Sequence, residues 1–154
     1  INVSSNSIID YAFPGWFAEQ LKSTCIDGSR VILQITAQSV LGNLRPTQRL
    51  AKELSLLGCR LAISMFDSER RTCQLLEHLD VAYVKLHPAL TEELTANAKH
   101  QEAVRKIVEA AEAHGVAVIA DEVTNTSSLA VLWQCGIKLI AGAFLRETTQ
   151  VLAQ

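Results

Sequence analysis

The stretch LAISMFDSERRTCQLLEHLDVAYVKL, residues 61–86, contains a complete strand–helix–strand unit. Leu61–Phe66 and Ala82–Leu86 are short apolar runs of strand length, and the intervening Ser68–Leu79 carries leucines along one helical side. The two runs are apolar on both faces, which is typical of parallel strands that are covered by helices. Residues 61–86 therefore predict a βαβ crossover within a parallel sheet.

The rest of the chain repeats this unit. Four further runs have strand length and composition: Ile1–Ser4, Val31–Thr36, Ala117–Val123 and Leu139–Leu145. The segments between the runs predict helices. One spans Phe13–Ser23, and a second has Pro46 at its first position and Gly58 after its end. A third spans His100–His114 before Gly115, and a fourth is capped by Thr126 or Ser127 and reaches Cys135 before Gly136. No linker or low-complexity stretch interrupts this alternation, so we predict one domain.

Two α/β architectures fit six strands in this order. An open, doubly wound sheet for dinucleotides needs a glycine-rich turn after its first strand. The corresponding stretch, VSSNS at residues 3–7, contains no glycine, and the chain has no GxxxxGK[ST] motif. A closed (β/α) barrel needs eight strands and about 250 residues. The pattern favours the C-terminal six units of a TIM-like barrel, with residues 1–154 forming a partial domain and the first part absent from this chain.

Composition excludes several classes of protein. The net charge of −2 does not indicate a nucleic-acid surface, and no apolar run reaches the roughly 18 residues of a membrane span. The four cysteines lack zinc-ligand spacing, so we expect small, semi-buried thiols in a reducing cytoplasm, with no metal and no cofactor. The chain opens at Ile1 rather than at Met, which allows for further chain before it.

Polar residues interrupt five of the six apolar runs, at or near their ends. They are Asn2, Gln34, Ser64, Lys85 and Asp121. Burial of one polar group without a partner costs about 1–3 kcal/mol, so we do not expect five buried polar side chains that each lack a partner. The carboxyl ends of barrel strands form the mouth at which ligands bind. We therefore predict that these residues, together with the adjacent Glu122, line one ligand-binding mouth.

Each of these residues also has a structural explanation. Gln34 and Ser64 could bond to each other or to nearby backbone, and Asp121 with Glu122 could form a solvated acidic loop. Lys85 lies among apolar neighbours and must reach either water or a carboxylate, for which Asp121 is the candidate.

Read in order, the segments resemble the EAL domain, the cyclic di-GMP phosphodiesterase barrel of bacteria. INVSS looks like its VNLS strand, VILQIT like LELEITE, and LAISMFDS like LALDDFGTG. VAYVKLHPAL is similar to VDYLKIDRSF, VIADEVTN to VVAEGVET, and LWQCGIKLIAGAFL to LxxLGCDLAQGYLF. Order and spacing agree over essentially the whole chain. The family's first third, with the namesake Glu-Ala-Leu, has no counterpart.

The departures from the family pattern bear on catalysis. Active members hold two divalent cations through carboxylates and an asparagine. The asparagine and a lysine are kept as Asn2 and Lys85. The replaced positions are Gln34 for a glutamate, Ser64 and Met65 for paired aspartates, Asp67 and Ser68 for a Gly-Thr loop, His87 for an aspartate, Asp121 and Thr124 for glutamates, and Ala141 for a glutamine. Mg²⁺ prefers carboxylate oxygens, so the resemblance implies a domain that is not an enzyme.

Three short patterns look like the FimX type of the family: Gln-Ile in the second strand, Ile-Ser-x-Phe in the third, and Leu-Trp-Gln near the end. That type binds cyclic di-GMP without cleaving it, acts in type IV pilus assembly and twitching motility, and docks a PilZ-domain protein. The resemblance thus implies a non-catalytic receptor that regulates pili, motility or biofilm through protein partners. Two alternatives stay open: a protein-interaction module that binds no nucleotide, and an active phosphodiesterase.

Overall fold

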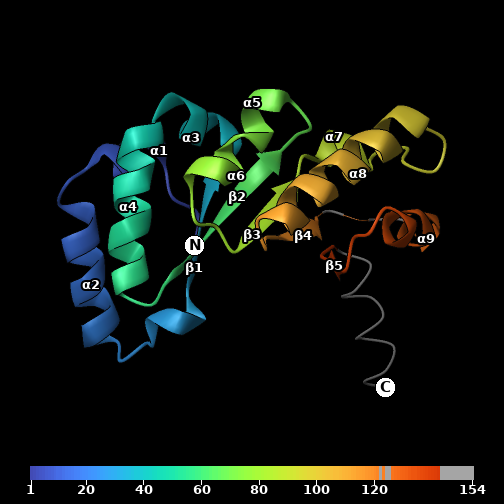
Figure 1. Ribbon diagram of the computed structural model, residues 1–154. Coiled ribbons are helices and arrows are strands. Elements are labelled where there is room, and N and C mark those ends of the chain that lie inside the picture. Colours follow the sequence, from blue (N-terminus) through green and yellow to red (C-terminus); the bar gives the residue numbers. More distant parts are fainter. Residues whose placement is uncertain (122, 124–125, 143–154) are drawn as a thin grey trace, which may run out of the picture.

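A five-stranded parallel sheet forms the centre of the computed structural model, which describes residues 1–121, 123 and 126–142 (Figure 1). Its strands lie side by side in the order of the sequence: β1 (Ile32–Thr36), β2 (Arg60–Phe66), β3 (Tyr83–Leu86), β4 (Ala117–Ala120) and β5 (Leu139–Ile140). Asn2 adds an isolated parallel bridge to Gln34, so the N-terminal segment lies beside β1. A doubly wound sheet reverses its order at a switch point, and the described strands contain no such reversal.

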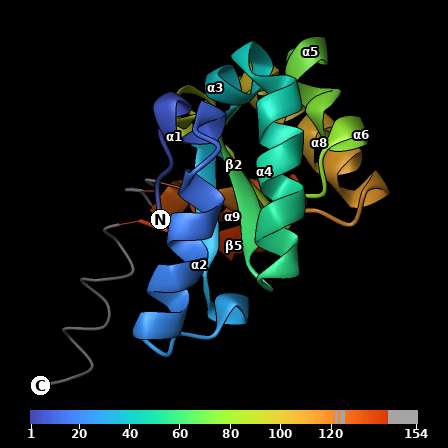
Figure 2. The ribbon, with the colours of Figure 1, turned by 90° about the vertical axis from the view of Figure 1, so that its left-hand side faces the viewer.

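Helices connect the strands. The described ones are α1 (Ser5–Ile9), α2 (Phe13–Ser23), α3 (Ala37–Gly42), α4 (Leu44–Leu56), α5 (Arg70–Cys73), α6 (Leu75–His78), α7 (Pro88–Thr91), α8 (Ala98–Ala113) and α9 (Thr126–Gln134), with the 3₁₀ turn η1 at Gly28–Arg30. α2 and α4 lie side by side (Figures 1 and 2). No helix in the described part of the chain is both long and apolar enough to cross a bilayer.

The two faces of the sheet differ in burial because side chains alternate along each strand. One face packs against helices, with α4 on β2 and α8 on β4, and its side chains, such as Leu33 and Val84, are fully buried. The opposite face is only half-buried at Gln34, Tyr83 and Lys85. Polar side chains therefore occupy the face that the helices leave open.

Most predicted elements are present, with corrected bounds. Ile1–Ser4 is not a strand, because only Asn2 bridges to β1 and the side chain of Ser4 already caps α1. The run Ala117–Val123 ends as a strand at Ala120, and β5 is described only over Leu139–Ile140, since residues 143–145 lie outside the described residues.

The helix starts also differ from prediction. α4 begins at Leu44, so Pro46 is its third residue, where the missing N–H is tolerated because the first turn has no helical acceptor. The Ser68–Leu79 helix divides into α5 and α6. α8 begins before His100 because the side chain of Asn97 accepts hydrogen bonds from two backbone N–H groups. Thr126 is the first residue of α9 rather than its cap.

Three glycines end helices as predicted. Gly58, Gly115 and Gly136 have φ values of 77°, 69° and 92°, the left-handed region that glycine adopts without a steric penalty.

The four cysteines are free thiols. Cys59 and Cys135 are buried and Cys73 is partly buried, but Cys25 is exposed, so the prediction of semi-buried thiols was wrong for Cys25. Burial raises the pKa of the Cys59, Cys73 and Cys135 thiols.

Gly28 in η1 permits a close backbone contact, and its replacement should destabilise the fold. A Cβ at this position would lie 1.9 Å from the carbonyl oxygen of Leu57. We expect Gly28→Ala to lower the free energy of unfolding of the full-length protein by about 3 kcal/mol, the upper part of the range for overpacking. Urea denaturation measures this change. Gly15→Ala is the control, because a Cβ there meets nothing within 4 Å. Equal midpoints for the two variants would contradict the expectation.

Candidate functional site

A pocket of about 280 Å³ opens at the carboxyl ends of the strands. It is lined by five of the six residues predicted for the mouth, namely Asn2, Gln34, Ser64, Lys85 and Asp121. They converge because parallel strands place their carboxyl ends along one edge, and because Gln34 and Lys85 lie on the half-buried face. Glu122, the sixth residue, lies outside the described residues.

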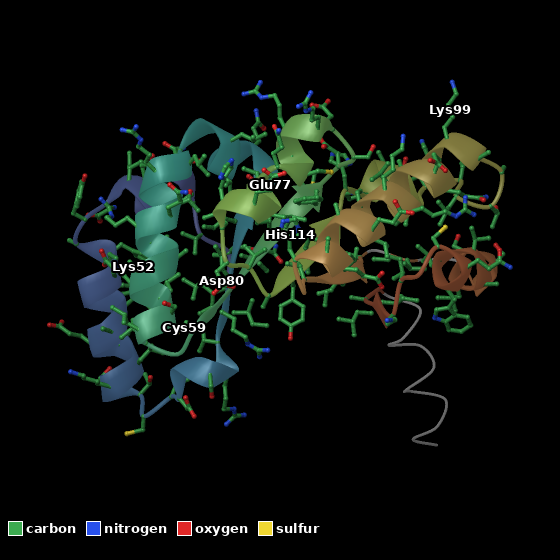
Figure 3. The ribbon with its side chains drawn as sticks, viewed as in Figure 1. Lys52, Cys59, Glu77, Asp80, Lys99 and His114 are labelled. Carbon is green, nitrogen blue, oxygen red and sulfur yellow. The ribbon has the colours of Figure 1, made fainter. Side chains whose placement is uncertain are left out.

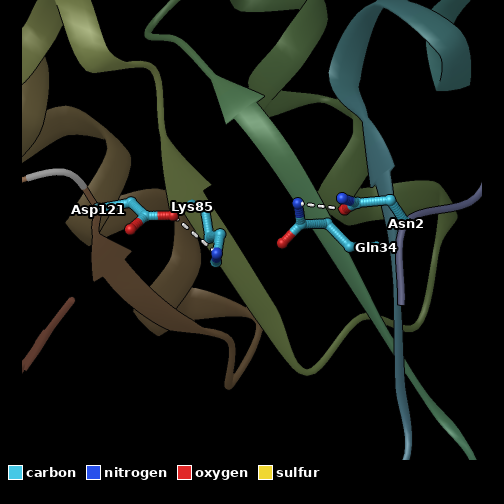
Figure 4. Close-up of polar contacts among 4 residues, drawn as sticks. All are labelled: Asn2, Gln34, Lys85 and Asp121. Carbon is cyan, nitrogen blue, oxygen red and sulfur yellow. Dashed lines mark hydrogen bonds and ion pairs between the residues drawn. The ribbon is translucent and has the colours of Figure 1, made fainter. Parts of the chain in front are cut away.

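The first pair of polar side chains in the pocket joins the N-terminal segment to β1. Gln34 Nε2 donates a hydrogen bond of 2.9 Å to Asn2 Oδ1 (Figure 4). Two backbone hydrogen bonds hold the segments in register, from Val3 N to Gln34 O and from Gln34 N to Ile1 O. The side chain of Gln34 thus bonds to Asn2 in the described structure, rather than to Ser64, which the sequence had left open as its partner.

The second pair joins β3 to the end of β4. Lys85 Nζ lies 2.7 Å from Asp121 Oδ2, and the two side chains are 27% and 32% exposed (Figure 4). Lys85 was predicted to reach either water or a carboxylate, and the ion pair shows that it reaches the Asp121 carboxylate. Its opposite charges cancel, but its exposure leaves the ammonium accessible to a ligand from solvent.

A bulge in β2 brings two consecutive residues into the pocket. The register between β2 and β3 shifts between Ile63 and Phe66, and Met65 has a φ of 55°. Ser64 and Met65 both line the pocket, although strand alternation alone would send them to opposite faces. The left-handed backbone of a non-glycine residue costs roughly 1–2 kcal/mol, and such strain tends to cluster at functional sites.

Besides the apolar Val3, Met65 and Leu86, sequence reasoning did not assign two further lining residues to the mouth, Thr36 and Pro88. Each lies at or just after the end of a strand, in β1 and after β3 respectively. Position at a strand end was the available signal, but neither residue interrupts an apolar run with a charge or an amide.

The residues of the pocket do not fit a divalent cation. The Asn2 oxygen accepts from Gln34, and the Asp121 carboxylate binds the Lys85 ammonium. Ser64 is uncharged, and the Met65 thioether is a soft ligand that suits a hard cation poorly. His87 Nδ1 accepts from Ala89 N as the cap of α7. Within the described ranges, no group of three or more His, Cys, Asp or Glu side chains could hold a metal.

A larger groove of about 520 Å³ lies elsewhere, between α4 and residues 78–82. Lys52, Cys59 and Asp80 line it (Figure 3). It lies beside the first residues of β2, at the opposite end of the strand from Ser64. Because Lys52 and Asp80 are exposed surface charges and ligands of parallel α/β folds bind at the carboxyl ends of the strands, we assign the candidate site to the smaller pocket.

The parallel sheet in sequence order and the polar pocket at its carboxyl edge define the α/β class of this domain. Residues 1–148 match the EAL domain, and the chain belongs to this family.

Several solved structures are similar over most of the chain, FimX EAL domains among them. The match to the FimX EAL domain covers 94% of this chain and 58% of the FimX chain, with 26% sequence identity and a TM-score of 0.88. The match to the FimX EAL domain of Pseudomonas aeruginosa bound to c-di-GMP covers 94% of this chain and 59% of that chain, with 26% sequence identity and a TM-score of 0.87.

Curated relatives are similar to this chain at 22–26% identity. The cyclic di-GMP phosphodiesterase PdeF of Escherichia coli strain K12 is 23% identical over 142 residues, which are 92% of this chain and 19% of that protein. The RNase E specificity factor CsrD of the same strain is 25% identical over 149 residues, which are 96% of this chain and 23% of that protein. The chain thus spans about a fifth of the length of these relatives.

Proposed function

We propose that this chain is part of a non-catalytic receptor for cyclic di-GMP. The observation that carries the proposal is the pairing within the pocket: two side chains at metal-binding positions of the family already have partners, Asn2 with Gln34 and Asp121 with Lys85. An enzyme of this family needs those oxygens free for cations that activate water. A receptor needs only complementary groups for an anionic dinucleotide.

The pocket offers such groups without a metal. The Lys85 ammonium has three N–H donors, so it can donate to a second oxygen, such as that of a phosphate, while it stays bonded to Asp121. The Ser64 hydroxyl stands where an aspartate would repel a phosphate in the absence of a cation. Carboxylates suit the adjacent N–H donors of a guanine edge, and Asp121 and Glu122 are the candidates. Asn2 and Gln34 complete the proposed ligand-binding set.

We further propose that the domain is degenerate and of the FimX type, and that it is the C-terminal two-thirds of a barrel. Three FimX EAL domains among the similar structures, two of them in complex with c-di-GMP, support the proposal that the domain is of the FimX type. Strands in sequence order, together with coverage of 58% of the FimX chain, support the proposal of a partial barrel. By this analogy the protein acts in the cytoplasm on type IV pili, motility or biofilm through a PilZ-type or other regulatory protein.

One observation favours the alternative of an interaction module that binds no nucleotide. Tyr11 and Trp16 are 82% and 55% exposed, and the Arg49 guanidinium lies 3.6 Å from the centre of the Tyr11 ring. Exposed aromatic side chains are enriched at protein interfaces.

Titration calorimetry of the full-length protein with cyclic di-GMP separates these functions. We expect the same affinity in EDTA buffer and in Mg²⁺ buffer, because the pocket supplies its own cation as Lys85. Absence of heat in both buffers would favour the interaction module. Binding that requires Mg²⁺ would contradict the metal-free receptor.

A further inference from the structure

Met65 is the one methionine of the chain, and it occupies an unusual environment for an apolar side chain. It is 41% exposed, whereas the other apolar residues of β2 are buried, and it lines the same pocket as Lys85 and Asp121. Val3 and Leu86 also line this pocket, but they are only 8% and 2% exposed. A flexible thioether is thus presented to solvent among the polar groups of the site.

The backbone explains this exposure. The register shift in β2 and the positive φ turn Met65 out of the ordinary alternation of the strand. Peroxides can therefore approach its sulfur from solvent without local unfolding of the sheet.

We propose that Met65 is a site of reversible oxidation that regulates ligand binding in this pocket, an inference that rests on the proposed receptor function. A sulfur lone pair attacks one oxygen of hydrogen peroxide, an S–O bond forms and the O–O bond breaks. Sulfur loses two electrons and the peroxide gains them. The released hydroxide takes the proton from the oxygen that is now bound to sulfur, and it leaves as water. Methionine sulfoxide reductases reverse the change with thiols as the reductant.

The sulfoxide changes the pocket in a way that opposes anion binding. It replaces an apolar group with a polar oxygen that accepts hydrogen bonds. Lys85 lines the same pocket of about 280 Å³, and its ammonium is a donor that this oxygen can engage. A bound phosphate and the new oxygen then compete for the same cation.

The thiols are the competing targets for an oxidant. Burial raises the pKa of Cys59, Cys73 and Cys135, which lowers the fraction of reactive thiolate at neutral pH. Cys25 is exposed but lies just after α2, outside the lining of the pocket. Oxidation of these cysteines can be separated from oxidation of Met65 by peptide mapping.

The test treats the full-length wild type and Met65→Leu with limiting hydrogen peroxide and maps the modified peptides by mass spectrometry. Each sample is then titrated with cyclic di-GMP in EDTA. We expect the Met65 sulfoxide form to bind roughly ten-fold more weakly than the reduced wild type, the scale of one lost charge-assisted contact. Methionine sulfoxide reductases A and B, supplied with a thiol, should restore the affinity. Met65→Leu is compared with itself and should bind equally before and after peroxide.

Three results would overturn the proposal: equal binding by the oxidised and reduced wild type, a peroxide effect that persists in Met65→Leu, or a Met65 that stays reduced while Cys25 is oxidised. If the reduced wild type does not bind at all, the receptor function itself fails. If the reduced and the oxidised wild type both bind with the same affinity, the receptor function stands and only the regulation by Met65 is refuted.

Discussion

Incubated with cyclic di-GMP and excess Mg²⁺ or Mn²⁺, the full-length protein is expected to leave the nucleotide intact. Two-metal hydrolysis requires cations that lower the pKa of bound water toward about 7. In this pocket Asp121 is bound to Lys85 and Asn2 is bound to Gln34, while Ser64 and Met65 offer no carboxylate. Chromatography of the reaction mixture for the linear dinucleotide measures turnover. Hydrolysis that disappears in Asp121→Asn would show that the site is catalytic after all.

Restored carboxylates should reverse the loss of cation binding. We expect the triple variant Gln34→Glu, Ser64→Asp, Met65→Asp to gain Mn²⁺ affinity that the wild type lacks. The bulge already turns positions 64 and 65 into one pocket, and aspartate tolerates the left-handed backbone of position 65 better than methionine does. Calorimetric titration with Mn²⁺ measures the gain, and the same triple variant with Asp121→Asn is the control. A triple variant as inert as the wild type would show that the geometry, and not only the ligand set, has diverged.

The positions of the five described strands were predictable from the sequence because buried parallel strands are continuous apolar runs, although the same pattern wrongly predicted a strand at Ile1–Ser4. The convergence of Gln34, Lys85 and Asp121 followed from the same reasoning, since the polar interruptions of these runs come near the carboxyl ends. The short helices α1, α3 and α7 span 4–6 residues, too few for helical periodicity to be visible. They form where side chains such as Ser4, Thr36 and His87 cap the chain after a strand or bridge.

The side-chain partners could not be predicted because they depend on register. Asn2 meets Gln34 only because the bridge aligns these two residues, and a shift of one position would turn Asn2 to the other face. The bulge at Met65 is likewise a property of how β2 pairs with β3, and nothing in ISMF, residues 63–66, marks it.

Replacement of Lys85 by alanine is expected to weaken cyclic di-GMP binding in EDTA by roughly 1–3 kcal/mol, the range for a charge-assisted hydrogen bond. This corresponds to a loss of about 5- to 150-fold in affinity. Among the five lining residues predicted from sequence and placed by the structure, Lys85 is the one cation, so a metal-free site depends on it for the phosphate. Calorimetric titration of the intact protein measures the change, and addition of EDTA to the wild type should alter nothing.

Two matched variants isolate the role of this ammonium. Lys52→Ala removes the same charge from the exposed surface of α4, in the groove at the other end of the strands, and should bind as the wild type does. Asp121→Asn releases Lys85 from its ion pair. If Asp121 only competes with phosphate for Lys85, this variant binds more tightly. If Asp121 also accepts from guanine, it binds more weakly. Equal binding by Lys85→Ala and the wild type would mean that the Lys85–Asp121 pair only joins β3 to the end of β4, and that the phosphate is held by other groups.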